Sequence, residues 1–322
     1  NNLAVDTTAS FSQSGIYVLR LTADDGQLSV SDTVQITVNP AAGGGGLPPD
    51  PSTVAAPLDP SVASSIGSGT EFLYTGPNPI QTGVAPGTIE PKRAAVLRGK
   101  VLTRDSAALS GVTITILNHP EFGQTLSRAD GMFDMAVNGG GLLTIKYDRA
   151  GFLPARRQLT VPWQDYAWLP DVVLIPQDTR VTMVNLTTPN FQIARGSSVS
   201  DGRGTRQATL LFAPGTQASV LLPNGTTQQL ATMNVRATEF SVGANGPKAM
   251  PASLPGTVAY THAVDFSVDE AAAAGGTSVA FSQPVVFYLE NFVGFPVGGG
   301  VPLGGYDPAK DTWVPHPNGR VV

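Results

Sequence analysis

The sequence predicts an all-β protein built from tandem β-sandwich domains, and three observations carry that prediction. Glycine and proline account for 36 and 27 of the 322 residues, which is too many helix breakers for long helices. Short runs of alternating apolar and polar residues recur along the chain, separated by turn dipeptides such as Asp130-Gly131 and Asn224-Gly225. Between residues 95 and 175 about seven such runs follow one another, which is the strand density of a small sandwich.

The N-terminal segment, residues 1–40, alternates on both sides of a turn at Asp24-Asp25-Gly26 and predicts antiparallel strands. It holds about three strands, which is too few for an independent sandwich. Residues 41–70 consist mainly of glycine, proline, alanine and serine, so they bury too little apolar surface to offset the entropy lost on ordering. We therefore expect a linker there. Residues 71–94 carry large apolar side chains among prolines and are expected to dock, extended, on a neighbouring domain.

Two larger β domains are expected after this segment. Residues 95–176 predict a compact sandwich, and residues 177–322 predict a larger one with about eight to ten strands. Residues 267–276, "SVDEAAAAGG", open with acidic residues and close with glycine, and they predict one helical turn. Residues 285–305, "VVFYLENFVGFPVGGGVPLGG", are apolar on both faces. They predict strands buried on two sides, as in a domain clamped inside a larger shell.

The composition excludes several classes of function. The net charge is −5 and the basic residues are scattered, whereas a nucleic-acid-binding protein needs a basic face. The small basic pairs Lys92-Arg93 and Arg156-Arg157 are expected to be solvated strand ends. The chain has no cysteine, so thiolate catalysis, iron–sulfur clusters and cysteine-based zinc sites are excluded. No apolar run approaches the ~18 residues that a membrane-spanning helix needs.

Asp130-Gly131, in "RADGMFDMAVNGGG", allows three interpretations. A calcium loop needs several oxygen ligands at short spacing, and here Asp134 is the only acidic residue that follows closely. A phosphate-binding loop needs glycines that open a helix, whereas "NGGGLLTIKY" runs directly into a strand. A tight turn explains the glycines without any ligand, because Gly adopts positive φ without steric strain. We therefore expect a turn.

No catalytic residue, metal site or cofactor is predicted, and the protein is not expected to be an enzyme. His119, His262 and His316 share no spacing typical of a metal or catalytic site. Paired-carboxylate chemistry needs two acids facing each other across a cleft, and the sequence offers no way to pair its candidates. Those candidates are Asp265, Asp269, Glu270 and Glu290.

Aromatic residues gather in two places, "VPWQDYAWLP" and the segment around "DPAKD". Aromatic clusters in loops form either recognition surfaces or packing plugs between domains. The candidate binding or packing anchors are Trp163, Tyr166, Trp168, Tyr306 and Trp313.

A resemblance to a known family emerges over residues 97–161. The pattern G-x-V, G-V-x-V-x-I, T-x-x-D-G-x-F and a later G-[FY] resembles the transthyretin-like, carboxypeptidase-regulatory-like sandwich. That module is an accessory domain wherever it occurs, so the resemblance implies a fold and no catalysis. The matching positions are Gly99, Val101, Gly111, Val112, Ile114, Ile116, Thr125, Asp130, Gly131, Phe133, Gly151 and Phe152.

A narrower resemblance includes "HPEFGQTLSRADGMFDMAVNGGG" and "RAGFLPARRQLTVPWQDYAWLPDVVLIP", which look like the transthyretin-like domain of teneurins and bacterial Rhs/YD-repeat proteins. Residues 1–40 resemble the last strands of a PKD-type or cadherin-like Ig-fold domain. Residues 177–322 then stand where that family has a plug-like β domain, followed by a YD-repeat shell. The resemblance implies a non-catalytic fragment of a large secreted or cell-surface bacterial protein, with the downstream shell of the same polypeptide as its partner.

Two alternatives to this function stay open. The chain could be an adhesin module that binds carbohydrate or another cell-surface ligand through its aromatic loops. It could also be an accessory domain of a secreted hydrolase, which rests on the regulatory-like sandwich alone.

Overall fold

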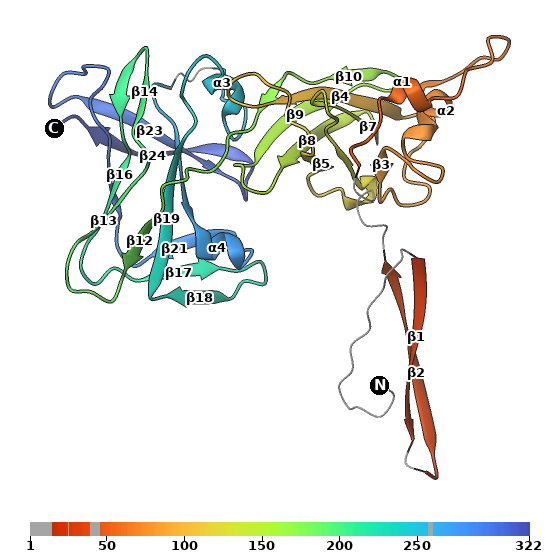
Figure 1. Cartoon of the computed structure of the whole chain (residues 1–322), viewed down its shortest axis with the longest axis horizontal. Coiled ribbons are helices and arrows are strands. Elements are labelled where there is room, and N and C mark those ends of the chain that lie inside the picture. Colours follow the sequence, from red (N-terminus) through yellow and green to blue (C-terminus); the bar gives the residue numbers. More distant parts are fainter. Residues whose placement is uncertain (1–14, 25, 39–45, 257–259) are drawn as a thin grey trace.

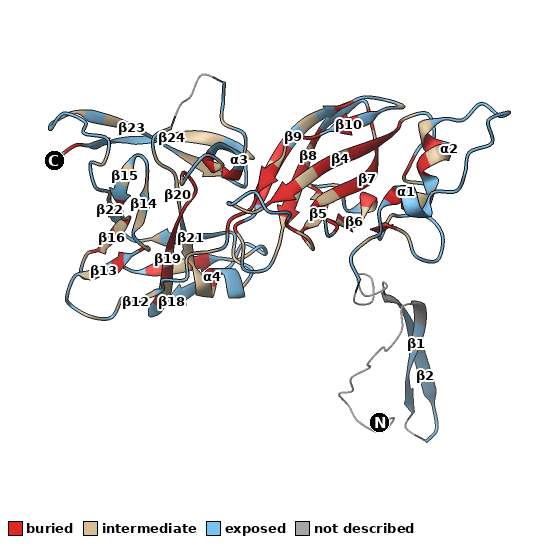
Figure 2. Ribbon diagram, turned by 45° about the horizontal axis from the view of Figure 1, so that its top comes forward, coloured by how far each residue is buried: buried red, intermediate tan, exposed pale blue. Residues whose placement is uncertain are grey.

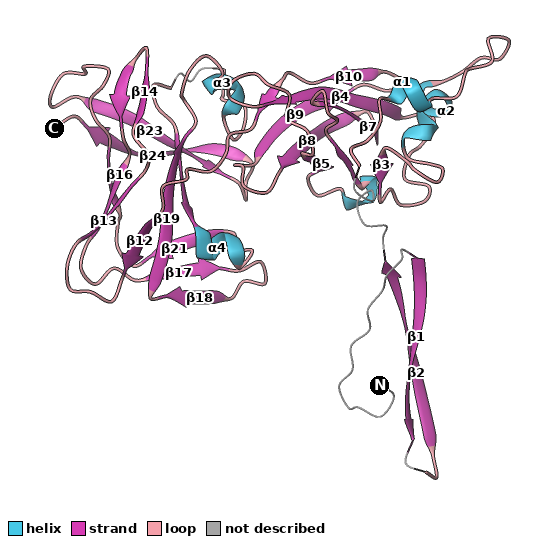
Figure 3. Cartoon of the chain, in the orientation of Figure 1, coloured by secondary structure: helices cyan, strands magenta, loops and turns pink. Residues whose placement is uncertain are grey.

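The computed structural model describes residues 15–24, 26–38, 46–256 and 260–322. Strands dominate these residues, which confirms the all-β class with β-sandwich architecture (Figure 3). Because a bilayer requires about 20 helical residues, none of the helices in this part of the chain could cross a membrane. The helices are α1 (Pro51–Val54), α2 (Ile66–Thr70), η1 (Glu71–Leu73), η2 (Pro120–Phe122), α3 (Gly246–Ala249) and α4 (Asp269–Ala273).

The first two strands form a long antiparallel hairpin, β1 (Gly15–Asp24) and β2 (Ser29–Val38), which stands apart from the other strands (Figure 1). At its turn the Gly26 amide donates to Asp24 Oδ1 at 2.7 Å. Residues 1–14 and Asp25 lie outside the described residues, and two of the about three expected strands fall within the described part. Leu21, Val30 and Val34 are exposed on the hairpin. The assignment of residues 1–40 to an Ig-like domain stays a prediction.

The segment expected to be a linker contains local structure from residue 50 onward. Asp50 caps α1 by accepting from the Ser52 amide at 2.8 Å, and Ser65 and Ser68 form a capping box on α2. Gly67 is buried because α2 packs on the strand that begins at Ala94; a Cβ there would lie 3.0 Å from the Pro91 carbonyl oxygen. Small residues therefore allow close packing in a stretch whose lack of large apolar residues predicted an unpacked linker.

Two sheets form the sandwich. In the first, β4 (Ala94–Leu102) pairs antiparallel with β7 (Met132–Asn138) on one side and parallel with β10 (Tyr166–Trp168) and β11 (Val172–Val173) on the other. The second sheet has five strands in the order β3-β6-β5-β8-β9. These are β3 (Gln81–Thr82), β6 (Gln124–Leu126), β5 (Thr113–Ile116), β8 (Gly141–Asp148) and β9 (Ala155–Val161).

The sandwich core lies between these sheets (Figure 2). In β5 and β8 alternate residues are buried, as in a half-buried strand. Strands β4 and β7 are instead buried at nearly every position. Phe133 of β7 and Tyr147 of β8 meet edge to face with ring centroids 5.7 Å apart. Other fully buried members are Leu97, Val101, Val112, Ile114, Met135, Ile145 and Val172.

The Asp130-Gly131 pair forms a turn, as predicted. The Met132 amide donates to Asp130 Oδ1 at 2.8 Å, and the Gly131 amide donates to the Arg128 carbonyl at 2.9 Å. Gly131 has φ of 80°, and its own carbonyl accepts from Val101. A Cβ at this position would lie 2.5 Å from the Val101 carbonyl oxygen, so the glycine is required for close packing as well as for the turn.

The C-terminal region holds three three-stranded sheets and two hairpins, with more and shorter strands than expected. The sheets are β12-β19-β20, β13-β16-β22 and β18-β17-β21, and the hairpins are β14-β15 and β23-β24. The helical turn expected within residues 267–276 is present as α4. The strands are β12 (Thr182–Asn185), β13 (Gln192–Arg195), β14 (Val199–Asp201), β15 (Gly204–Arg206), β16 (Thr209–Phe212), β17 (Ala218–Leu221), β18 (Thr227–Leu230), β19 (Thr232–Glu239), β20 (Val264–Val268), β21 (Ser278–Phe281), β22 (Val286–Tyr288), β23 (Gly300–Asp307) and β24 (Thr312–Arg320).

Residues 285–305, which the sequence predicts to be buried on both faces, are instead partly exposed. Val286, Tyr288 and Val297 are all exposed. Only inward-facing residues such as Phe287 pack against the core of this region. The periodicity correctly finds apolar side chains on both faces, but only one face is covered within the described residues.

Candidate functional site

The structure separates the five aromatic anchors into two groups. Trp163, Tyr166 and Trp168 lie on and just before β10, at the edge of the sandwich. Tyr306 and Trp313 face each other across the β23–β24 hairpin, with ring centroids 5.6 Å apart. The first group forms an exposed surface, and the second belongs to the contact between the sandwich and the C-terminal region.

The Trp163 ring lies close against the backbone of Gly139 and Gly140. A Cβ on Gly140 would lie 2.0 Å from Trp163 Nε1, and one on Gly139 would lie 3.1 Å from Cδ1 of the same ring. The residue nevertheless remains 58% exposed. The glycines thus let the indole rest directly on the backbone, while much of the ring is left open to solvent.

Tyr166 and Trp168 flank the guanidinium of Arg98 on the neighbouring strand β4. The Arg98 Cζ atom lies 4.9 Å from the Tyr166 ring centroid and 5.4 Å from that of Trp168. Asp134 fixes this arginine through a 2.5 Å bond, and its second oxygen accepts from Arg128 at 2.5 Å. Since cation–π and ionic contacts both hold Arg98, the two rings are positioned before any partner binds. We call Trp163, Tyr166 and Trp168 the aromatic ledge.

The sandwich and the C-terminal region share an apolar cluster. The sandwich contributes Leu102, Leu153, Val173 and Ile175, and the C-terminal region contributes Phe240, Ala249 and Met250. Trp313 packs against this cluster and donates from Nε1 to the Ser253 carbonyl at 3.0 Å. A cluster drawn from both parts of the chain makes their contact resemble a continuous core.

Strand β9 is the outer strand of its sheet, and the C-terminal region covers it. The Arg156 amide donates to the Pro251 carbonyl at 2.7 Å. The Arg157 side chain donates to the carbonyls of Met250 at 3.0 Å and Lys248 at 2.7 Å. Burial lowers the pKa of the Arg157 guanidinium. The prediction that Arg156-Arg157 forms a solvated strand end is therefore wrong, because α3 and the residues after it lie against this strand.

A second polar contact joins the tip of the β23–β24 hairpin to the outward face of β8 and β9. Asp311 accepts from Thr144 Oγ1 at 3.0 Å and from Gln158 Nε2 at 2.9 Å, and its other oxygen accepts from the Tyr306 hydroxyl. Arg156 lies 3.4 Å from Asp311 and donates to the Pro308 carbonyl at 2.7 Å. The Asp311 side chain is 16% exposed. We call these contacts of Asp311 the Asp311 socket.

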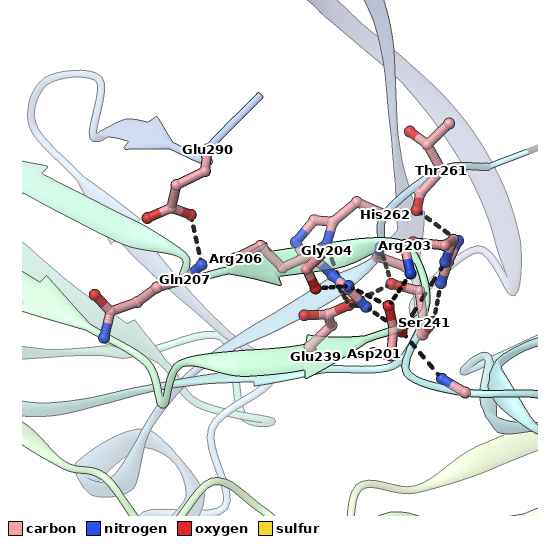
Figure 4. A network of polar contacts seen from close by, with 12 residues as sticks. Asp201, Arg203, Gly204, Arg206, Gln207, Glu239, Ser241, Thr261, His262 and Glu290 are labelled. Atoms are coloured by element: carbon pink, nitrogen blue, oxygen red, sulfur yellow. Dashed lines mark hydrogen bonds and ion pairs between the residues drawn. The ribbon is translucent and has the colours of Figure 1, made fainter. Parts of the chain in front are cut away.

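Inside the C-terminal region, the buried Arg206 holds two carboxylates (Figure 4). It donates to both oxygens of Asp201 at 2.9 Å and to Glu239 Oε1 at 2.7 Å. The hydrogen bonds from Arg206 hold the pKa of Asp201 well below its usual range. Two carboxylates fixed by one arginine stabilise β14, β15 and β19 against each other, and neither is free to act as a base.

The candidate residues for catalysis or metal binding do not converge. His119 pairs with Glu121, His262 lies buried with Nδ1 3.5 Å from Glu239, and His316 belongs to β24. Across the described ranges, no group of three or more histidines and acids could hold a metal ion.

The four candidate acids do not pair with each other: three of them bind nearby donors, and the carboxyl of the fourth, Asp265, is buried. Asp269 binds Arg236 at 2.6 Å, Glu270 accepts from the Asn234 amide at 2.8 Å, and Glu290 accepts from the Gln207 amide at 2.5 Å. Burial raises the pKa of Asp265.

Sequence reasoning missed Arg157, Arg206 and Asp311. Each is an ordinary charged residue in the sequence and acquires its role from partners far along the chain, such as Met250 for Arg157 and Thr144 for Asp311. One local signal was available for Arg157. It occupies the inward phase of its strand, directly opposite the buried Ile145.

Residues 89–174 match the family model described as the Teneurin TTR-like domain. Teneurin-3 of Danio rerio is 30% identical over 143 residues, which cover 43% of this chain and 5% of that protein. Teneurin-1 of Gallus gallus is 40% identical over 95 residues, covering 29% and 4%. Teneurin-m of Drosophila melanogaster is 38% identical over 104 residues, covering 32% and 4%. The chain thus aligns with about a twentieth of the length of these relatives.

Among solved structures, the Bacillus anthracis TIE protein aligns with 43% of this chain and 31% of its own, at 15% identity and a TM-score of 0.24. A score this low identifies no shared overall fold. The likeness to teneurins therefore rests on the sequence match within the sandwich.

Proposed function

We propose that this chain is a non-catalytic structural module of a large secreted or cell-surface YD-repeat protein, and that its C-terminal region caps or plugs the β shell of that protein. The domain limits proposed are a linker at 41–70, a docking segment at 71–94, the transthyretin-like sandwich at 95–176 and the plug at 177–322. The match of residues 89–174 to the teneurin domain supports the assignment of the sandwich. Asp269, one of the four candidate acids, is engaged in an ion pair with Arg236, and Arg206 pairs with Asp201.

The single observation that carries the plug role is an exposed apolar sheet face. In the β13-β16-β22 sheet, Ile193, Leu211 and Val286 lie in register across the three strands and face the same side. Ile193 and Val286 are 47% and 49% exposed. Tyr288, two residues after Val286 on β22, extends the same face, and Phe191 lies just before β13; both are exposed.

This apolar sheet face lies at the end of the C-terminal region far from the sandwich (Figures 1 and 2). A contiguous apolar face on a soluble protein marks an interaction site, because leaving it in water is unfavourable. The inner wall of a surrounding β shell would cover it, in the way that two sheets pack face to face. The sandwich would then remain outside as the cap.

The test is co-expression of this chain with the shell segment of the same polypeptide. We expect the two to co-purify and to resist protease together. The double variant Ile193→Asp/Val286→Asp places two charges on the apolar sheet face and should abolish co-purification. Met183→Asp, at an exposed apolar position on β12, is the control and should leave it intact. If the double variant binds the shell as well as the control does, the plug role is wrong.

One observation favours a second function, that of a carbohydrate- or cell-surface-binding module. The open Trp163 ring on its glycine support, beside two further fixed aromatic rings, suits stacking against the flat face of a sugar. Tyr306 and Trp313 are engaged in the contact with the sandwich, so the aromatic ledge alone would bind.

A glycan array with variants of the ledge tests this second function. Gly140→Ala should displace the Trp163 ring, because the new Cβ has no room and φ is 93° at this position. Gly141→Ala is the matched control, since a Cβ there meets nothing within 4 Å. Saturable binding that is lost in Gly140→Ala and Trp168→Ala but kept in Gly141→Ala would support the ledge. Binding that all three variants retain would contradict it.

A further inference from the structure

Two of the contacts between the C-terminal region and the sandwich have opposite chemical character. One is the apolar cluster around Ile175 and Met250, reinforced by the Arg157 contacts with two carbonyls. The other is the Asp311 socket, whose contacts across to the sandwich are all polar. Further hydrogen bonds lie next to the apolar cluster and help to fix it, from Arg104 to the Glu239 carbonyl at 2.6 Å and from Asn245 to the Arg104 carbonyl at 2.8 Å. The Asp311 socket is the contact that holds the β23–β24 hairpin on the sandwich.

The β23–β24 hairpin that carries Asp311 has few other supports. It is a two-stranded sheet that pairs with no further strand in the described part of the chain, and most of β24 after Val314 is exposed. Two-stranded hairpins are only marginally stable in water by themselves. Trp313 joins the hairpin to the rest of the C-terminal region by donating to the Ser253 carbonyl. Asp311 joins the hairpin to the sandwich.

The tip itself is built to present this carboxylate. Asp311 has φ of 51°, a conformation that few residues other than glycine adopt. The Tyr306 hydroxyl donates to it from the opposite strand of the hairpin. Its three partners on the sandwich lie on one face, because Thr144 is directly opposite Gln158, and Arg156 is two residues from Gln158 along β9.

We infer that Asp311 is a latch: it docks the β23–β24 hairpin on the transthyretin-like sandwich, and its release lets the hairpin tip move away while the apolar cluster and the hydrogen bonds beside it stay in place. The residues of the sandwich that hold Asp311 are Arg156, Gln158 and Thr144. This inference does not depend on the plug role, because it concerns the contact between two parts of the same chain.

The experiment uses the whole chain, which has no natural cysteine, so that two spin labels can be placed uniquely. Lys92→Cys labels the sandwich and Ala309→Cys labels the hairpin tip, and both positions are exposed. Pulsed electron–electron distance measurements should give one narrow distribution for the labelled wild type. Asp311→Ala should broaden it, with a displaced population raised about tenfold, as expected for the loss of charge-assisted hydrogen bonds.

Asp307→Ala is the matched control. Asp307 lies in the same tip, but its partners are Ala309 and Lys310 within the hairpin, and it touches nothing on the sandwich. The double variant Arg156→Gln/Gln158→Ala removes two of the donors to Asp311 on the sandwich. It should broaden the distance distribution as Asp311→Ala does. Hydrogen exchange at residues 248–251 should stay slow in all of these variants, because the apolar cluster and the Arg157 contacts remain in place.

Two results would overturn the latch. One is a distribution in Asp311→Ala as narrow as that in Asp307→Ala. The other is exchange at residues 248–251 that accelerates as much as at the hairpin tip, since the two parts would then separate as a whole and the hairpin would not be released alone.

Discussion

At the scale of single residues, charged side chains occupy buried positions where apolar side chains are usual, and they stabilise the packing there through hydrogen bonds. Arg157 faces the inside of the sandwich from an edge strand, and it stays charged there by donating to carbonyls of a distant segment. Arg206 does the same within the C-terminal region by holding two carboxylates. Buried charges of this kind add directionality, because each donor requires its acceptor at one position.

Arg157→Met tests the value of this directionality. Methionine keeps most of the length of the side chain but leaves the carbonyls of Lys248 and Met250 without their donor. We expect a loss of about 2 kcal/mol in the free energy of unfolding, measured by urea titration. Arg195→Met, at an exposed position on β13, should change it by less than about 0.5 kcal/mol. Equal losses in the two variants would contradict a structural role for Arg157.

At the scale of secondary-structure elements, the sandwich protects the edges of its sheets. The outer side of β7 is closed by a side chain: Gln81 donates to the Ala136 carbonyl at 2.9 Å and accepts from its amide at 2.6 Å. The outer side of β9 is closed by the Pro251 carbonyl and the hairpin tip. Covered edges resist pairing with other chains, which matters for a module with many short strands.

Only part of this arrangement could be predicted from the sequence. The turn at Asp130-Gly131, the helical turn at α4 and the alternating strands of the sandwich depend on neighbours within a few residues, so local patterns suffice to find them. The closing of β9 depends on Arg156 meeting Pro251, nearly a hundred positions later, and no local pattern encodes that contact. The sequence places the five candidate aromatic residues in two clusters, but it does not indicate which cluster is exposed and which is packed.

The hairpin tip gives a pH prediction at the same scale. Burial raises the pKa of Asp311, but the hydrogen bonds from Tyr306, Gln158 and Thr144 lower it by more, so its net pKa in the docked state is below the ordinary value. A carboxyl with a lowered folded-state pKa contributes stability that is fully present above its unfolded pKa and is lost as the pH falls through the lowered value. The tip should therefore stay docked at neutral pH and loosen in acid.

Broadening of the distance between labels at residues 92 and 309 from pH 7 to about pH 3 measures this loosening. Asp311→Asn, which cannot titrate, should show no such acid transition. Burial and the bond to Asp311 raise the pKa of Tyr306 to about 12, so the hydroxyl that donates to Asp311 keeps its proton throughout this range. An unchanged acid transition in Asp311→Asn would assign it to another group.

At the scale of the whole molecule, the sandwich and the C-terminal region share buried apolar residues, and that sharing predicts how they unfold. Met250 is fully buried among Leu102, Val173 and Ile175 of the sandwich, although it belongs to the other part of the chain. Exposing this cluster would be unfavourable for both parts, so neither should unfold alone. Calorimetry of the chain should show one cooperative transition for residues 46–322.

Met250→Asp separates this coupling from the stability of each part. A buried carboxylate without a partner is costly enough to open the cluster, but both of the remaining cores keep their own apolar residues. The single transition should then split into two, the lower one belonging to the C-terminal region, whose strands are shorter and more exposed. Leu58→Asp, at an exposed position, should keep the single transition. Two transitions already present in the wild-type chain would show that the shared cluster does not couple the two parts. The sandwich and the C-terminal region would then be two independently folding domains.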